Sequence, residues 1–203
     1  MTGVQTCALP ISLPLDGQWD FYDGVFASSD DLKAEIYNEI KTDVRVPYSW
    51  NSKRLDGKPS AFGYGTYVLK IVLSENNNRL FGIKTTGIRD SNKIFVNGRI
   101  VGQNGVPEKT AKEYSPANVP YTTYFNIDGN ELELIVWVAN FDYTTSAGIV
   151  TPIYFGTLES IEGLRVTSLA NDIIIISAFL IVGILFSILF FYRKKEKYFG
   201  CFA

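Results

Sequence analysis

Carboxylates are the residues of this chain that come closest to a catalytic set. Glycoside hydrolysis needs two carboxyl groups roughly 5–10 Å apart on either side of a sugar. The candidates are Asp16, Asp20, Asp56 and Asp142. Nothing in the sequence pairs any two of them, and roles in turns or caps account for each one more simply. We therefore expect the chain to have no enzymatic activity of its own.

Other polar chemistry is restricted by what the composition lacks. The 203 residues contain no histidine, so the usual general base and the commonest metal ligand are missing. Cys7 and Cys201 lie near opposite ends of the chain, which leaves no zinc site or disulfide framework between them. The net charge of −2 creates no field for a polyanion. We expect no metal, no cofactor and no nucleic-acid partner.

Aromatic side chains are candidates for contact with a ligand. Trp50 and Tyr64 stand next to predicted loop residues. Their rings either stack on the face of a sugar or pack in the core, as aromatic rings commonly do, and the sequence leaves both alternatives open. For Trp19 and Trp137 we expect a place in the core.

The most plausible recognition segment is the long stretch Gln103–Pro120. Loops of this length in compact domains tend to be functional or disordered. The segment contains Asn104, Glu108 and Tyr114, and Arg89 stands beside the preceding hairpin. An ion pair between Arg89 and Asp90 is the structural alternative there. The predicted ligand-binding residues are Trp50, Tyr64, Arg89, Asn104, Glu108 and Tyr114.

The sequence predicts that short β-strands position these residues. Apolar and β-branched runs are separated by Gly, Asn, Asp and Pro, which predicts a sandwich or barrel. The runs are Thr66–Leu73, Leu80–Thr86, Lys93–Val96, Arg99–Val101, Tyr121–Ile127, Glu131–Ala139 and Gly148–Phe155. Asn97-Gly98 predicts a type I′ hairpin turn. In this region, only Asp30–Ile40 reads as helical.

A membrane span is predicted at residues 173–192. This segment has no charged residue, and about 20 apolar residues cross a hydrocarbon core of about 30 Å. Asp172 precedes it, and Arg193, Lys194, Lys195 and Lys197 follow. The positive-inside rule predicts that the C-terminal side is cytoplasmic and the β domain extracellular. The lipid bilayer is thus an expected partner.

The stretch before the span also shows helical periodicity. Leu158, Ile161 and Leu164 recur at spacings of three, and Leu169 returns to the same face. We expect a helix from about Leu158 that runs into the span. It is either a stiff connection between domain and membrane or a short amphipathic cover for the base of the sandwich.

The two ends suggest a fragment. Met1–Ile11 resembles the conceptual translation of a common sequencing adapter, and the C-terminal end is expected to be a cut through a continuing chain. The predicted organisation is an adapter-derived segment at 1–12, an extracellular domain at 13–156, a juxtamembrane helical linker at 157–172, a transmembrane helix at 173–192, and a cytoplasmic loop with the start of a further span at 193–203.

A series of short motifs then points to a family. The series is Leu15–Phe21, Val46–Trp50, Gly63–Tyr67, Ile94–Gly98, Val138–Asn140 and Ile153–Gly156. It resembles the galactose-binding-like jelly roll at the front of β-galactosidases and β-glucuronidases. With a membrane span directly after it, the chain is similar to bacterial seven-transmembrane receptors with diverse intracellular signalling modules.

This resemblance implies a fold and a function. The fold is an all-β jelly-roll sandwich followed by a transmembrane helix. The function is an extracellular sensor for a small molecule or carbohydrate, in a receptor whose output domain is of the histidine kinase or cyclase type. The full-length receptor is expected to be a homodimer. The alternative is a single-span, surface-anchored carbohydrate-binding or adhesive domain without signalling.

Overall fold

The computed structural model of the chain describes residues 12–50, 60–73 and 80–199, with side chains up to residue 193. The adapter-like Met1–Ile11, Asp56 and the expected further span after residue 199 lie outside the described residues. The chain divides into two compact units, Met1–Ile161 and Glu162–Ala203, which are described separately.

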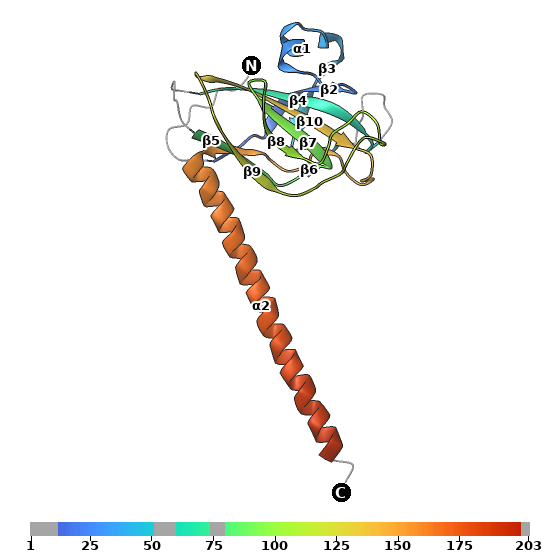
Figure 1. Ribbon diagram of the computed structural model, residues 1–203, viewed down its shortest axis with the longest axis vertical. Coiled ribbons are helices and arrows are strands. Elements are labelled where there is room, and N and C mark those ends of the chain that lie inside the picture. The colour runs from blue at the N-terminus through green and yellow to red at the C-terminus, as the bar shows by residue number, and fades with distance from the viewer. Residues whose placement is uncertain (1–11, 51–59, 74–79, 200–203) are drawn as a thin grey trace. The chain divides into compact units, whose positions relative to one another are not determined.

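The first unit is an antiparallel β-sandwich, which confirms the all-β fold expected from the sequence (Figure 1). Its strands are β1 (Leu13–Pro14), β2 (Gly17–Asp23), β3 (Lys41–Val46), β4 (Gly63–Val72), β5 (Leu80–Thr85), β6 (Ile88–Arg89), β7 (Ser91–Val96), β8 (Arg99–Asn104), β9 (Tyr121–Asn126), β10 (Glu131–Asn140), β11 (Gly148–Ile149) and β12 (Tyr154–Thr157). The large sheet has the order β3-β2-β4-β10-β7-β8.

Strand β10 is one of the two central strands of the large sheet. It pairs with β4 along its whole length and with β7 on its other side. Because side chains alternate between the two faces of a strand, Leu132, Leu134, Val136 and Val138 all enter the core, where each is at most 1% exposed. Trp137 lies on the other face with a smaller apolar cluster around Ile135. The alternation in the sequence thus gives the correct inner face.

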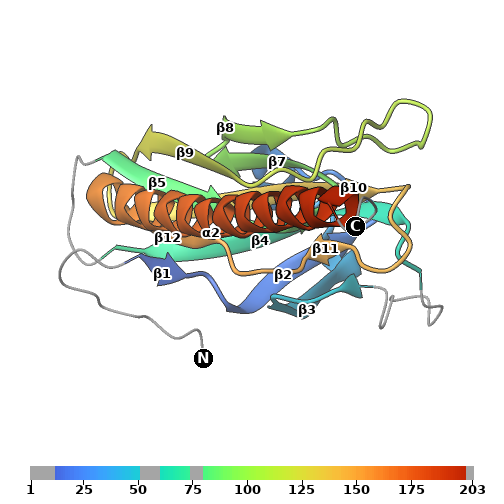
Figure 2. The ribbon, with the colours of Figure 1, turned by 90° about the horizontal axis from the view of Figure 1, so that it is seen from below.

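The second layer has the order β1-β12-β5-β9, visible from below in Figure 2. A small third sheet pairs β11 with β6. The prediction of one final strand over Gly148–Phe155 is therefore wrong, because β11 and β12 belong to different sheets. Pro152 lies between them and has no N–H to continue a ladder.

Aromatic rings fill the space between the layers. Trp19 is 2% exposed, and its indole Nε1 donates to the Leu15 carbonyl oxygen at 3.1 Å. Its ring meets Tyr67 edge-on at a centroid distance of 6.5 Å, and Phe21 lies 4.7 Å from Tyr67. The core placement expected for Trp19 is found.

The hairpin turn at Asn97-Gly98 has the predicted geometry. Asn97 has φ 47° and Gly98 has φ 78°, the two positive values of a type I′ turn. Asn97 also accepts a hydrogen bond at Oδ1 from the Glu133 backbone N–H at 2.7 Å. This hydrogen bond joins the turn to β10.

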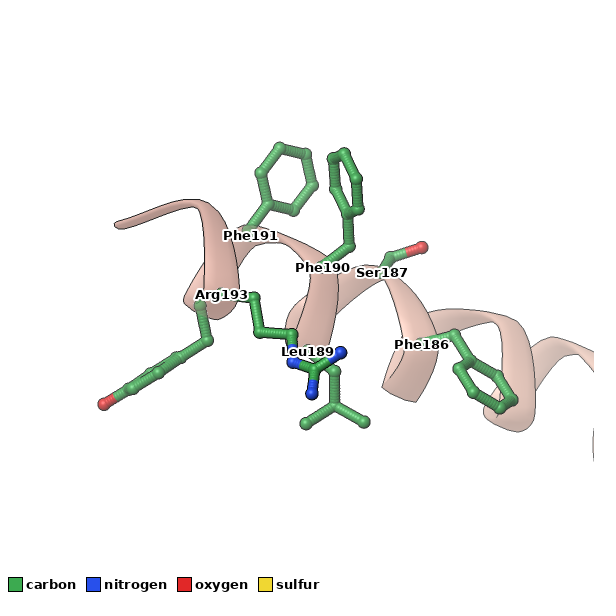
Figure 3. A pocket seen from close by; sticks show the side chains of 7 residues that line it. Phe186, Ser187, Leu189, Phe190, Phe191 and Arg193 are labelled. Atoms are coloured by element: carbon green, nitrogen blue, oxygen red, sulfur yellow. The ribbon is translucent and has the colours of Figure 1, made fainter. Parts of the chain in front are cut away.

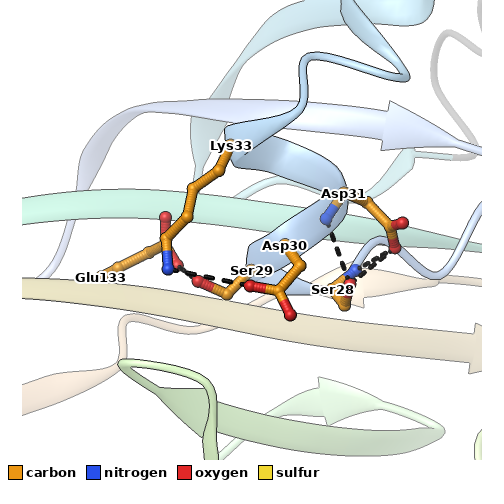
Figure 4. Close-up of polar contacts among 6 residues, drawn as sticks. All are labelled: Ser28, Ser29, Asp30, Asp31, Lys33 and Glu133. Atoms are coloured by element: carbon orange, nitrogen blue, oxygen red, sulfur yellow. Dashed lines mark hydrogen bonds and ion pairs between the residues drawn. The ribbon is translucent and has the colours of Figure 1, made fainter.

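The single helix predicted over Asp30–Ile40 is wrong in extent. The structure has a short helix, α1 (Ser29–Lys33), and a separate 3₁₀ turn, η1 (Asn38–Ile40). Glu35 between them has φ 55°, which interrupts helical geometry. The Ser28 hydroxyl and the Asp31 carboxylate form a capping box at the start of α1 (Figure 4).

The described part of the second unit is one helix. Helix α2 (Leu158–Phe199) begins directly after β12, and its first turn, up to Ile161, belongs to the sandwich unit. Between Ile173 and Tyr192 every large apolar side chain is 47–74% exposed. Among the described residues, α2 is the one helix that is long and apolar enough to cross a bilayer, which is compatible with a membrane anchor.

Candidate functional site

Trp50, one of the predicted ligand contacts, is part of the core. Its side chain is 6% exposed and its ring stacks on Tyr67 at 6.4 Å with an interplanar angle of 7°. The indole Nε1 donates to the Ala61 carbonyl oxygen at 2.9 Å. With its ring packed in the core and its N–H paired, Trp50 is not placed to stack on a sugar.

Tyr64 lies elsewhere on the sandwich. Its ring is 5.0 Å from that of Phe26, and Phe26 stacks on Trp137 at the same distance. Trp137 is on the outer face of the large sheet, where its Nε1 donates to the Ala27 carbonyl oxygen at 2.8 Å. This aromatic row attaches the β2–β3 connection to the sheet, so Tyr64 has a structural role here.

Asn104 and Glu108 belong to the predicted recognition segment. The Asn104 side-chain amide donates to the Val119 carbonyl oxygen at 2.5 Å, which closes the base of the segment 105–120. Glu108 is half-buried, and no side-chain hydrogen bond or ion pair joins it to another described residue. Asn104 therefore shapes the segment.

Arg89 and Tyr114 lie around one group of polar residues. We call Arg89, Asp90, Tyr114, Asp142 and Tyr143 the loop cluster. The Arg89 guanidinium carbon is 4.6 Å from the centre of the Tyr143 ring. The Tyr114 ring meets Phe141, beside Asp142, edge-on at 5.4 Å.

Asn140, at the end of β10, holds the loop that carries Asp142 and Tyr143. This fully buried amide donates to the carbonyl oxygens of Ala61 at 2.9 Å and Tyr143 at 2.7 Å. Its Oδ1 accepts from the Tyr143 backbone N–H at 2.9 Å. Asn140 and Tyr143 are not among the ligand-binding residues predicted from the sequence. The Val138–Asn140 motif is the signal that marks the position.

Burial dominates the electrostatics of the loop cluster. Asp90 is 6% exposed, and burial raises the pKa of its carboxyl group; nearby Arg89 lowers this pKa and Asp142 raises it. The side chains of Arg89 and Asp90 are not within ion-pair distance of each other, so the ion pair that was the structural alternative for Arg89 is not formed. In Tyr143, a hydrogen bond with Thr145 and then one with Arg89 lower the phenol pKa.

Two atoms of the loop cluster have unusual surroundings. Arg89 Nε and the Tyr114 hydroxyl are the buried side-chain polar atoms of the described residues that have no hydrogen-bond partner. Burial, and then the charge of Asp90, raise the pKa of the Tyr114 phenol. The Phe141 backbone N–H lowers it, but its geometry does not reach that of a hydrogen bond.

The carboxylates of the described residues are the remaining candidates for metal binding and catalysis. Within residues 12–50, 60–73 and 80–199, no three acidic or cysteine side chains are grouped to hold a metal ion. Of the carboxylates considered for catalysis, Asp20 forms an ion pair with Lys41 at 2.9 Å, a structural role on β2 and β3. The loop cluster is suited to binding through hydrogen bonds and an exposed ring.

Two other surfaces of the described residues are hollowed. A groove of about 470 Å³ runs beside α1, past Lys33, Lys70 and Glu131. Its polar groups are largely used within the fold: Ser29 donates to Glu133 at 2.5 Å, and Lys33 faces Asp30 at 3.9 Å (Figure 4). The other surface, lined by Phe186, Leu189, Phe190 and their neighbours, belongs to α2 alone, and its rings point outward (Figure 3).

Comparison with known proteins identifies the fold only. No family model and no curated protein matches the chain. A glycosyl hydrolase family 2 member from Bacteroides cellulosilyticus superposes with a TM-score of 0.55, at 18% identity over 71% of this chain and 20% of that protein. A β-glucuronidase from Ruminococcus gnavus superposes with a TM-score of 0.53, at 15% identity over 77% of this chain and 30% of that protein. A family 2 β-galacturonidase from Eisenbergiella tayi superposes with a TM-score of 0.51, at 16% identity over 76% of this chain and 25% of that protein.

The chain therefore spans less than a third of each of these proteins. At this identity the likeness shows a shared β-sandwich and carries no activity over to the chain.

Proposed function

We propose that this chain is the extracellular ligand-sensing part of a membrane signalling receptor. The sandwich binds a small molecule or carbohydrate at the loop cluster, and helix α2 carries the response into the membrane. The neighbouring solved structures are parts of sugar-processing enzymes, which agrees with a carbohydrate as ligand.

The observation that carries the proposal is the junction between β12 and α2. Thr157 ends the strand and Leu158 begins the helix, with no linker residue between them. Ile161, in the first helical turn, is fully buried. It packs over Gly82 of β5, where an added Cβ would lie only 3.2 Å from the Ile161 Cβ. A shift in the sandwich layer therefore displaces the first turn of the helix, which a flexible Gly/Ser linker would not transmit.

Ligand acts in this scheme as a shift in population between two arrangements of the sandwich and the first turn. The ligand needs different affinities for the two arrangements, because a ligand that binds both equally shifts nothing. A domain that only anchors a ligand at the surface has no need for a helix that starts inside its core.

The response is tested with the full chain in lipid nanodiscs. With Cys7 and Cys201 changed to serine, a fluorophore at Tyr192→Cys reports on the helix while a saccharide panel is screened by thermal shift. A ligand that raises the melting temperature is expected to change the label's emission. A short Gly-Ser insertion after Thr157 should abolish that change without changing the dissociation constant, whereas the same insertion in the exposed turn at Asp128 should leave both unchanged. Binding without any change at the label would favour the surface-anchored alternative.

Orientation has its own test in intact cells. In a chain with Cys7 and Cys201 changed to serine, the positive residues after the span predict that Asp128→Cys reacts with an impermeant thiol reagent from outside, and that Lys197→Cys reacts only after permeabilisation. The reverse labelling pattern would contradict an extracellular sandwich.

A further inference from the structure

The loop cluster concentrates unsatisfied polar groups in one place. Both buried side-chain atoms without a hydrogen-bond partner among the described residues, Arg89 Nε and the Tyr114 hydroxyl, belong to it. Tyr114 is only 8% exposed. Leaving such atoms unpaired costs free energy, which a ligand that supplies the missing hydrogen bonds would recover.

The charges of the loop cluster disfavour an anion. Arg89 is its one cation, whereas Asp90 and Asp142 are two carboxylates, and the Asp90 charge acts on both Tyr114 and Tyr143. An incoming carboxylate would meet an excess of negative charge around a guanidinium that already faces a tyrosine ring. Like charges in a partly buried site repel strongly because the local dielectric is low.

The hydrogen-bonding capacities of Asp90, Arg89 and Tyr114 match those of ligand hydroxyl groups. Ionised Asp90 only accepts, Arg89 only donates, and the Tyr114 hydroxyl does both. A ligand hydroxyl also donates and accepts, so it matches the hydrogen-bonding capacity of each of the three groups, whereas a ligand carboxylate offers nothing to Asp90. Tyr143 is 40% exposed and adds a flat apolar surface.

We infer that the loop cluster binds an uncharged ligand with adjacent hydroxyl groups, such as a neutral sugar, and discriminates against the corresponding sugar acids. The inference rests on the proposed sensing function and specifies its ligand. Access involves the segment 105–120, whose Ala117 backbone N–H donates to the Asp90 carbonyl oxygen at 3.1 Å. Because the Tyr114 hydroxyl is shielded from water, this segment moves when the ligand binds.

The test compares matched sugars on the full chain in nanodiscs by calorimetry. Methyl β-galactoside and methyl β-glucoside are titrated alongside their 6-carboxylate counterparts, at concentrations up to about 50 mM. At least one neutral sugar is expected to bind about tenfold more tightly than its acid. Amide exchange across residues 105–120 is expected to change with the neutral sugar.

Three variants sharpen the assignment. Asp142→Asn should reduce the discrimination against the acid by about fivefold, because it removes a repelling charge. Tyr114→Phe keeps the ring contact with Phe141 and should weaken neutral-sugar binding by about fivefold without lowering the melting temperature, since the hydroxyl has no partner to lose. Asp128→Asn, in an exposed turn, is the charge-matched control. It should change neither the discrimination against the acid nor the affinity for the neutral sugar.

An acid that binds as tightly as its neutral counterpart would overturn the inference, and so would the absence of binding by every sugar to a folded chain. Failure of the sensing proposal looks different. If a ligand of another class from the thermal-shift screen binds and moves the helix label, the sensor proposal survives while the hydroxyl-ligand inference fails.

Discussion

The sandwich and helix α2 present the same residue types to opposite surroundings. In the sandwich, Ile83 and Ile94 are completely buried. In α2, Ile173 and Ile184 are 63% and 59% exposed, and rings such as Phe186 point outward as well. Burial of apolar surface away from water stabilises the first unit, whereas the exposed apolar side chains of the second unit are compatible with a membrane anchor.

The largest expected effect tests the water-stabilised unit. Trp19→Ala removes a buried ring and should lower the free energy of unfolding of the sandwich by about 3–5 kcal/mol. Urea titration of the full chain in nanodiscs, read by protease resistance of the sandwich, measures this loss. Phe186→Ala removes a comparable ring from α2 and should leave the midpoint unchanged. Equal losses in both variants would mean that α2 shares the core of the sandwich.

A charge placed in each unit tests the difference in solvent. Ile184→Asp, near the middle of the span, should disfavour membrane insertion by about 3–4 kcal/mol. The fraction of chain that stays with membranes after a carbonate wash is the measurement. Ile100→Asp is the matched control, because Ile100 is 60% exposed on β8, close to the 59% of Ile184. An unchanged membrane fraction for Ile184→Asp would contradict a lipid-facing helix.

The junction between the units predicts a smaller effect. Ile161→Val removes one methylene carbon from a fully buried position and should destabilise the sandwich by about 0.5–1.5 kcal/mol, seen as a lower urea midpoint. Ile173→Val makes the same change at an exposed position of α2 and should have no such effect. If both variants behave alike, the first turn of α2 does not belong to the sandwich core.

The smallest effect concerns a buried charge that the sandwich tolerates. Burial raises the folded-state pKa of Asp90 above its unfolded value, so the folded state binds more protons between these two pKa values. The stability of the sandwich therefore falls as pH rises through this window, and the loss is complete above the folded pKa. Asp90→Asn should remove this fall, which urea midpoints at acidic and neutral pH measure. A variant less stable than the parent at neutral pH would show instead that the carboxylate makes a stabilising contact.

Local sequence signals predict the structure correctly wherever a short-range rule determines it. The alternation in β10 gives its buried face, and Asn97-Gly98 gives the hairpin turn. The same rules were insufficient at Asp30–Ile40, where a left-handed Glu35 divides a predicted helix, and at Gly148–Phe155, which serves two sheets. Helix period and β-propensity describe single elements, whereas these two segments depend on which neighbours they meet.

The candidate site was predicted in part for a similar reason. Loop position and chemistry predict Arg89 and Tyr114, and the structure places both around Asp90. The prediction of Trp50 and Tyr64 depends only on the position of their aromatic rings next to loop residues. Sequence neighbourhood does not tell whether a ring points into the core, as for Trp50, or packs on the outer face of a sheet, as for Tyr64.

The sequence alone determines that the chain has an apolar helix at residues 173–192 and an alternating β domain before it, because hydropathy and strand period are local properties. Only the tertiary structure decides that Arg89, Tyr114 and Tyr143 form one cluster. These residues come from three separate segments, which meet because β10 pairs with β7 and because buried Asn140 holds the loop after β10. Long-range pairing of this kind leaves no periodic signal in the sequence, which is why the loop cluster and the buried first turn of α2 emerge only from the fold.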